Sequence, residues 1–170
     1  MGRTSIEPLH ALDVAQHYDV MVWSPLDIQG ISPTDLNHLL NAGQGEWSGF
    51  TVRINTRHLV VVNVAQSGRR QNSVIMHELA HIILGHEPAN AIITEAGHLV
   101  PSTYDQNQED EAAWLGSTLL IPRPALLWMR RRRMSDEEAA NYFAVSPDLL
   151  KWRIRTTGID YQLTSTTRKV

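Results

Sequence analysis

The chain has 170 residues, a formal net charge of −3 and no cysteine. A chain of this length and apolar content can bury a sizeable core, so we expect a single domain over residues 1–170. The small net charge gives no global field that would draw the protein to nucleic acid or to a membrane. The lack of cysteine excludes disulfides and thiolate zinc ligands.

The sequence pattern carries no targeting signal. Residues 1–8 lack the apolar core of a signal peptide. No apolar run approaches the length of a membrane span. We therefore expect a soluble, cytoplasmic protein.

The N-terminal part is predicted to hold helices and a small sheet. Residues 9–18 favour a helix, residues 20–23 favour a short strand, and Ser32-Pro33 is a good start for a second helix. The β-branched runs at residues 50–55 and 59–64 predict the two strands of a hairpin.

A mostly buried helix is expected next, from Ser73 to Leu84, because its apolar residues are too many for an exposed helix. The pair Ser67-Gly68 before it favours a turn, and Gly85 is a natural helix stop. A loop is expected around residues 97–107.

The predicted buried helix contains the string His77-Glu78-Leu79-Ala80-His81. Two histidines four residues apart on a helix project from one face, so their imidazoles can take two corners of one zinc site. Glu78 leaves the helix about 100° round from His77. It can therefore reach a metal-bound water and take its proton during attack on a carbonyl, as in zinc-dependent peptide hydrolases.

A catalytic zinc site needs a third protein ligand and an open fourth position. His86 lies five residues after His81 and beyond the Gly85 stop, which favours a supporting or surface role. The longer metzincin pattern fails, because the positions of its glycine and histidine are occupied by Leu84 and Glu87.

Two acidic residues remain as candidates for the third ligand, at the start of a helix predicted over residues 109–121. The face that begins at Glu109 continues with small residues such as Ala112 and Gly116, so it can approach another helix closely. The face of Glu111 carries Trp114 instead, which would hold a neighbour away. Helical geometry thus favours Glu109 over Glu111, although both remain possible ligands.

Two motifs resemble the ImmA/IrrE metallopeptidases. Residues 77–86 resemble the zinc helix of that family, and residues 109–122 resemble its second helix, whose glutamate ligand falls on Glu109. The resemblance continues at Phe143-Ala144-Val145-Ser146 and Arg153, so it covers roughly residues 59–159. It implies an intracellular protease that cleaves a helix-turn-helix transcriptional repressor or an antitoxin-like partner.

The second helix departs from the family pattern at three positions. Ala113, Leu115 and Gly116 stand where the family usually has Asn, Phe and Ala. None of these changes removes a proposed ligand.

Three further helices are predicted to close the chain, over residues 124–132, 135–143 and 146–155. The turn between the last two has helix-turn-helix spacing, but the final helix offers only Lys151, Arg153 and Arg155 as basic groups, so we expect packing on the core. The run Arg130 to Arg133 is interpreted as a solvated helix end, and direct binding of nucleic acid is disfavoured.

Together these patterns predict a mostly helical α+β metallopeptidase domain with a small antiparallel sheet next to the zinc-binding helix. The expected parts are N-terminal helices and sheet at residues 1–70, zinc-binding helices at 71–122 and C-terminal helices at 123–170.

The predicted activity is that of a zinc endopeptidase. His77, His81 and Glu109 would hold Zn²⁺, and Glu78 would act as general base. Tyr104 is a candidate oxyanion donor. The alternative is a regulatory binding module that grips a helix-turn-helix partner without cutting it.

Overall fold

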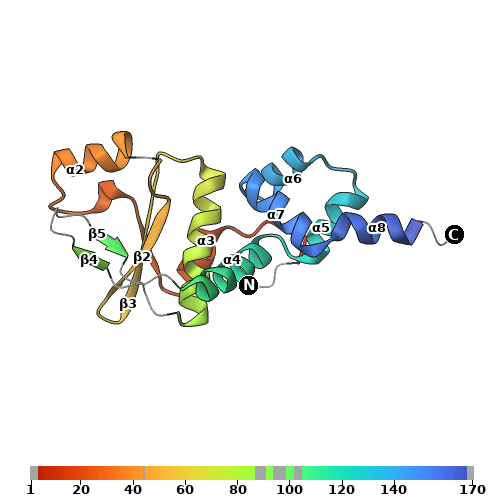
Figure 1. Ribbon diagram of the computed structural model, residues 1–170, viewed down its shortest axis with the longest axis horizontal. Coiled ribbons are helices and arrows are strands. Elements are labelled where there is room, and N and C mark those ends of the chain that lie inside the picture. Colours follow the sequence, from red (N-terminus) through yellow and green to blue (C-terminus); the bar gives the residue numbers. More distant parts are fainter. Residues whose placement is uncertain (1–3, 44, 87–90, 94–98, 102–104, 168–170) are drawn as a thin grey trace.

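The computed structural model describes residues 4–43, 45–86, 91–93, 99–101 and 105–167. A small sheet lies at one end of the molecule and the C-terminal helices lie at the other, with helix α3 (Gly68–Leu84) between them (Figure 1). This arrangement confirms the predicted mostly helical α+β fold. No helix in the described part of the chain is long and apolar enough to cross a membrane.

The main sheet has the strand order β1-β3-β2. Strands β2 (Gly49–Ile54) and β3 (Arg57–Val62) form the predicted antiparallel hairpin. Strand β1 (Met21–Trp23) pairs in parallel with β3, so the sheet is mixed and the antiparallel expectation holds for the hairpin alone. A parallel strand needs a long return connection. The chain makes it through η1 (Pro25–Asp27), α2 (Pro33–Asn37), η2 (His38–Ala42) and then strand β2 itself.

A second, smaller sheet pairs β4 (Ala91–Ile93) with β5 (Leu99–Pro101) in antiparallel fashion. This second sheet was not predicted, and part of the loop expected around residues 97–107 is β5.

Helix α3 runs from Gly68 to Leu84. The Ser67 hydroxyl caps it by accepting a hydrogen bond from the Arg70 N–H at 3.3 Å, so the predicted turn at Ser67-Gly68 is the first turn of the helix. The helix ends at Gly85, whose φ of 71° is left-handed, as expected for a glycine stop. Helix α1 (Ala11–His17) and strand β3 pack on α3.

Helix α4 (Gln106–Leu120) lies directly against α3. Its N-cap is Asp105, whose carboxylate accepts from the N–H of Asn107 at 2.9 Å. At Gly116 a Cβ atom would stand 3.0 Å from the carbonyl oxygen of Met76 and 3.3 Å from the Cα of His77. The small-residue face of α4 therefore brings the two helix backbones into contact, as the sequence predicted.

The three predicted closing helices are present as α5 (Arg123–Arg131), α6 (Asp136–Tyr142) and α7 (Pro147–Thr157). A further helix, α8 (Ile159–Thr167), follows Gly158 and was not predicted. Large side chains from these helices and their connections are fully buried with α3 and α4, among them Phe143, Leu150 and Ile159.

Two polar side chains of α3 tie this helix to other parts of the chain. Asn72 accepts from the Ala11 N–H at 2.7 Å and donates to the Ala144 carbonyl at 2.8 Å. Ser73 accepts from the Ser146 N–H at 3.1 Å. These bonds hold α1 and the α6–α7 connection against the N-terminal half of α3.

Replacement of Gly116 by valine should lower the free energy of unfolding by roughly 1–3 kcal/mol, because the added carbons meet backbone atoms that cannot turn aside. Chemical denaturation measures the change. Gly68→Val is the matched control, since a Cβ at that helical glycine meets no atom within 4 Å. Equal stability losses in the two variants would contradict the close-contact interpretation.

Candidate metal centre

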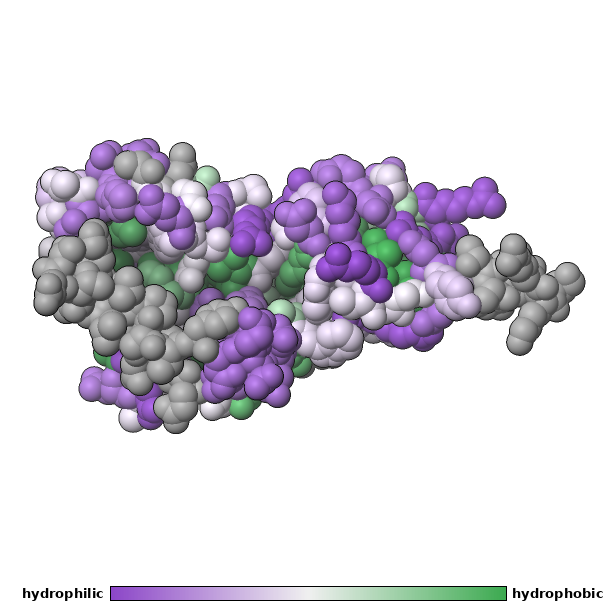
Figure 2. Space-filling model, viewed as in Figure 1, coloured by the Kyte–Doolittle hydropathy of each residue, from purple (hydrophilic) through white to green (hydrophobic). Residues whose placement is uncertain are grey.

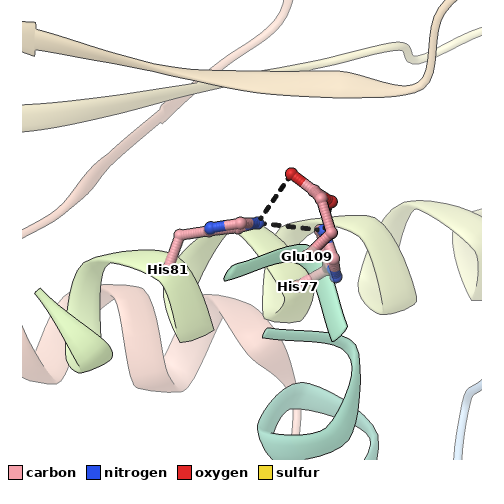
Figure 3. Close-up of side chains that lie close together, drawn as sticks. All are labelled: His77, His81 and Glu109. Carbon is pink, nitrogen blue, oxygen red and sulfur yellow. Dashed lines mark hydrogen bonds and ion pairs between the residues drawn. The ribbon is translucent and has the colours of Figure 1, made fainter. Parts of the chain in front are cut away.

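Three side chains from two helices meet at one point (Figure 3). His77 and His81 project from neighbouring turns of α3, and Glu109 projects from the first turn of α4. The Nε2 atoms of the two histidines are 3.2 Å apart. Glu109 Oε2 lies 3.1 Å from His77 Nε2, and Glu109 Oε1 lies 3.5 Å from His81 Nε2. These potential ligand atoms all lie within 4.8 Å of one another.

The separations fit a tetrahedral metal ion. Zinc holds nitrogen and oxygen ligands at about 2.0–2.1 Å, which places neighbouring ligand atoms roughly 3.3 Å apart. The observed separations of 3.1, 3.2 and 3.5 Å lie close to that edge length. The side chains keep relative exposures of 30% for His77, 18% for His81 and 36% for Glu109, so the centre is open to solvent on one side.

Hydrophilic residues cover much of the face seen in Figure 2, and apolar residues are visible in its hollowed part.

The Glu78 carboxylate reaches strand β2 of the sheet. The Thr51 hydroxyl, on β2, donates a 2.7 Å hydrogen bond to its carboxylate. Burial raises the pKa of Glu78 above its ordinary value, an effect that the Thr51 bond and His77 oppose and that Glu109 strengthens. A carboxylate with a raised pKa is a better proton acceptor near neutral pH.

Thr51 was missed by the sequence interpretation. It faces α3 because side chains alternate along a strand. A Cβ at Gly49, two residues earlier, would already touch the Val74 side chain of α3. The hydrogen-bonded pair joins residues 27 positions apart, so no local pattern could have revealed it.

The second nitrogen of His81 is also engaged. His81 Nδ1 lies 2.9 Å from His86 Nδ1, and His86 Nε2 lies 3.1 Å from a carboxylate oxygen of Glu111. Burial, followed by the nearby His77, lowers the pKa of His81, which favours the neutral imidazole that a metal requires.

The two candidate glutamates of α4 therefore lie in different places. Glu109 is beside His77 and His81, and Glu111 is beside His86. Tyr104, the candidate oxyanion donor, lies outside the described residues.

The arginine-rich turn is involved in structural contacts. Arg130 forms ion pairs with Asp136 and Asp160, both at 2.7 Å, and the Arg132 guanidinium lies 4.9 Å from the Trp128 ring centroid. These contacts tie the C-terminal end of α5 to α6 and α8.

The possible DNA-reading helix is α7, and it is packed on the core. Its Arg153 is 2% exposed and donates to the Ile121 carbonyl at 3.2 Å. That leaves only two of the three basic groups of this helix, Lys151 and Arg155, on the surface.

Comparison with known families places most of the chain in a peptidase family. The family model described as the IrrE N-terminal-like domain, which defines a peptidase family, matches residues 34–155. The match includes the strand that carries Thr51, both helices of the candidate centre and the helices up to α7. It confirms the resemblance inferred from the two helical motifs. No curated protein and no solved structure matches the chain.

In the metal-free protein, Glu78→Gln should raise the free energy of unfolding, and the gain should grow with pH. Because its pKa is raised, Glu78 stays protonated in the folded state at pH values at which the unfolded state has lost the proton. The free energy of unfolding of the wild type therefore falls as pH rises from about 4.5 through the folded pKa. Glutamine cannot ionise and can still accept the Thr51 hydroxyl.

Denaturation of chelator-treated protein across this pH range measures the effect. Asp110→Asn, an equivalent charge removal on the exposed side of α4, is the control. A stability difference between Glu78→Gln and wild type that does not vary with pH would contradict the assignment of the pKa shift.

Proposed function

The chain belongs to the peptidase family of the IrrE N-terminal-like domain, and on this premise we propose that it is a zinc-dependent endopeptidase. The observation that carries the proposal is the convergence of His77, His81 and Glu109 at ligand separations that suit a tetrahedral ion. Two imidazoles and one carboxylate form a donor set typical of catalytic zinc.

In this proposal the two α3 histidines and Glu109 hold the metal and leave its solvent side open. When bound there, zinc would supply a Lewis acid that polarises a peptide carbonyl and makes water acidic enough to attack at neutral pH. The rest of the chemistry belongs to the protein's own side chains.

Glu78 is the general base. Its carboxylate accepts a proton from the attacking water and then gives that proton to the leaving amine. The Thr51 hydrogen bond fixes the orientation of the carboxylate, and its partial burial keeps it basic. A protein that only grips a partner has no use for a positioned base, so this arrangement favours catalysis over the binding-module alternative.

Strand β2 offers a place for a peptide. Among the described strands it pairs with β3 alone, so its other edge has backbone groups free to pair with an extended chain. Its Thr51 contacts Glu78, so a peptide on this strand would pass near the base.

The substrate that the family resemblance implies is a helix-turn-helix transcriptional repressor or an antitoxin-like protein. Such a substrate would place the activity in the cytoplasm. Proteins of this type encoded by neighbouring genes are the first to test.

Purified protein should contain about one zinc per chain, as measured by elemental mass spectrometry. Glu109→Ala should lose the metal, because two histidines alone leave the site incomplete. Asp110→Ala, a matched removal of the neighbouring exposed carboxylate, should retain the metal. A fully metallated Glu109→Ala variant would instead move the third ligand to Glu111.

Glu78→Gln should keep the zinc and lose turnover by about 10²–10⁴-fold, because glutamine has no proton-accepting carboxylate. Time courses of repressor cleavage with equal amounts of zinc-loaded wild type and variant give the ratio. A candidate partner that binds but stays intact with the wild type would favour the binding module. Loss of zinc from Glu78→Gln would overturn the general-base assignment.

A further inference from the structure

We propose that His86 and Glu111 are positioning residues that fix the ring of His81 for metal binding through a hydrogen-bonded chain His81–His86–Glu111. The inference rests on the proposed metal site and adds two residues that lie outside the candidate ligand set.

The hydrogen-bonded chain is continuous from the candidate ligand atom, His81 Nε2, to the surface. His81 presents Nε2 to His77 and Glu109, and its other ring nitrogen, Nδ1, is 2.9 Å from His86 Nδ1. His86 Nε2 is 3.1 Å from Glu111 Oε2. The His86 side chain is only 7% exposed, whereas Glu111 is 65% exposed. A nearly buried imidazole thus has a partner for each of its two nitrogens.

The positions of the protons follow from the chemistry of each group. A histidine that binds a metal through Nε2 carries its proton on Nδ1, and His81 therefore donates to His86. The accepting Nδ1 of His86 has no proton, which places the proton of that ring on Nε2. From there it is donated to Glu111, whose ionised carboxylate only accepts. Each partner selects the tautomer of the next ring.

The backbone explains how His86 reaches His81. On a continuous helix a residue five positions later would be turned about 140° away. The left-handed Gly85 instead ends α3, and the His86 N–H bonds to the His81 carbonyl at 3.0 Å. This cap turns the chain back along the helix, so that the His81 and His86 rings meet with centroids 5.0 Å apart.

The hydrogen-bonded chain also assigns a role to Glu111, the second candidate glutamate of α4. Glu109 faces the two α3 histidines, and Glu111, two residues later on the same helix, faces the histidine that supports one of them. Supporting hydrogen bonds of this kind orient a ligand ring and raise its basicity, and their loss typically weakens metal binding by about 10–100-fold.

Two substitutions of His86 separate its hydrogen bond from its bulk. His86→Phe keeps an aromatic ring but removes the acceptor for His81, and zinc affinity should fall about 10–100-fold. His86→Asn places its Oδ1 where Nδ1 stood, so it should recover most of the affinity despite its smaller size. Glu111→Ala should weaken binding in the same direction, and Asp110→Asn should not. Competition with a chromophoric zinc chelator measures each affinity on the full chain.

A second readout reports the ring itself. In zinc-loaded wild type, nitrogen NMR of labelled histidine should show His81 protonated at Nδ1 and metal-bound at Nε2, with the Nδ1 proton protected from exchange. His86→Phe should lose this protection and His86→Asn should regain it. A merely structural role for His86 predicts no such rescue.

The outcomes separate this inference from the proposed function. Wild type that takes up no zinc would overturn both. Wild type with one tightly bound zinc, and equal affinity in His86→Phe and Glu111→Ala, would overturn only the role of the hydrogen-bonded chain. If His86→Phe does not fold, the comparison of Glu111→Ala with Asp110→Asn decides the question, since both changes are on the surface of α4.

Discussion

The contact between the backbones of α3 and α4 is the constraint on which the candidate centre depends. Its potential ligands come from two helices, so the distance between the helices determines the distance between the ligand atoms. That distance is set where Gly116 meets the Met76 carbonyl and the Cα of His77, one of the candidate ligands. Ligand atoms 3.1–3.5 Å apart tolerate little drift, because metal–ligand bonds vary by only about 0.2 Å. Close packing of small residues is therefore a condition of the chemistry as well as of stability.

The sheet supplies a further part of the site, next to the candidate ligands. Strand β2 lies close enough to the helix for the Thr51 hydroxyl to reach Glu78, the neighbour of His77. One helix thus directs its histidines toward α4 and its carboxylate toward the sheet. This division follows from the turn of about 100° between adjacent helical residues. It separates the candidate base from the candidate ligands without any loop being required to carry either.

Local patterns in the sequence predicted the elements whose structure is determined by residues close together in the chain. The histidine spacing, the Gly85 stop, the β-branched hairpin and the small face of α4 all follow from periodicity and backbone preference. The parallel pairing of β1 and the Thr51–Glu78 bond could not be predicted in this way, because both join segments that are distant in the sequence. Helix α8 was not predicted because its residues lack a clear apolar period. Ser67 was misinterpreted because serine followed by glycine suits both a turn and a helix cap.

The placement of His86 shows why helical phase alone was an incomplete guide. Extrapolation of α3 beyond Gly85 puts this residue far from the ligand face. A left-handed glycine replaces that extrapolation by a reversal, which brings the imidazole alongside His81 and within reach of Glu111 on α4. The glycine that ends the helix thus also determines which groups surround its last histidine. Because α4 is already held against α3 at Gly116, its N-terminal part can present Glu109 to His81 and Glu111 to His86. The helix cap thus places His86 beside Nδ1 of His81, and the helix contact places Glu109 beside Nε2 of the same ring.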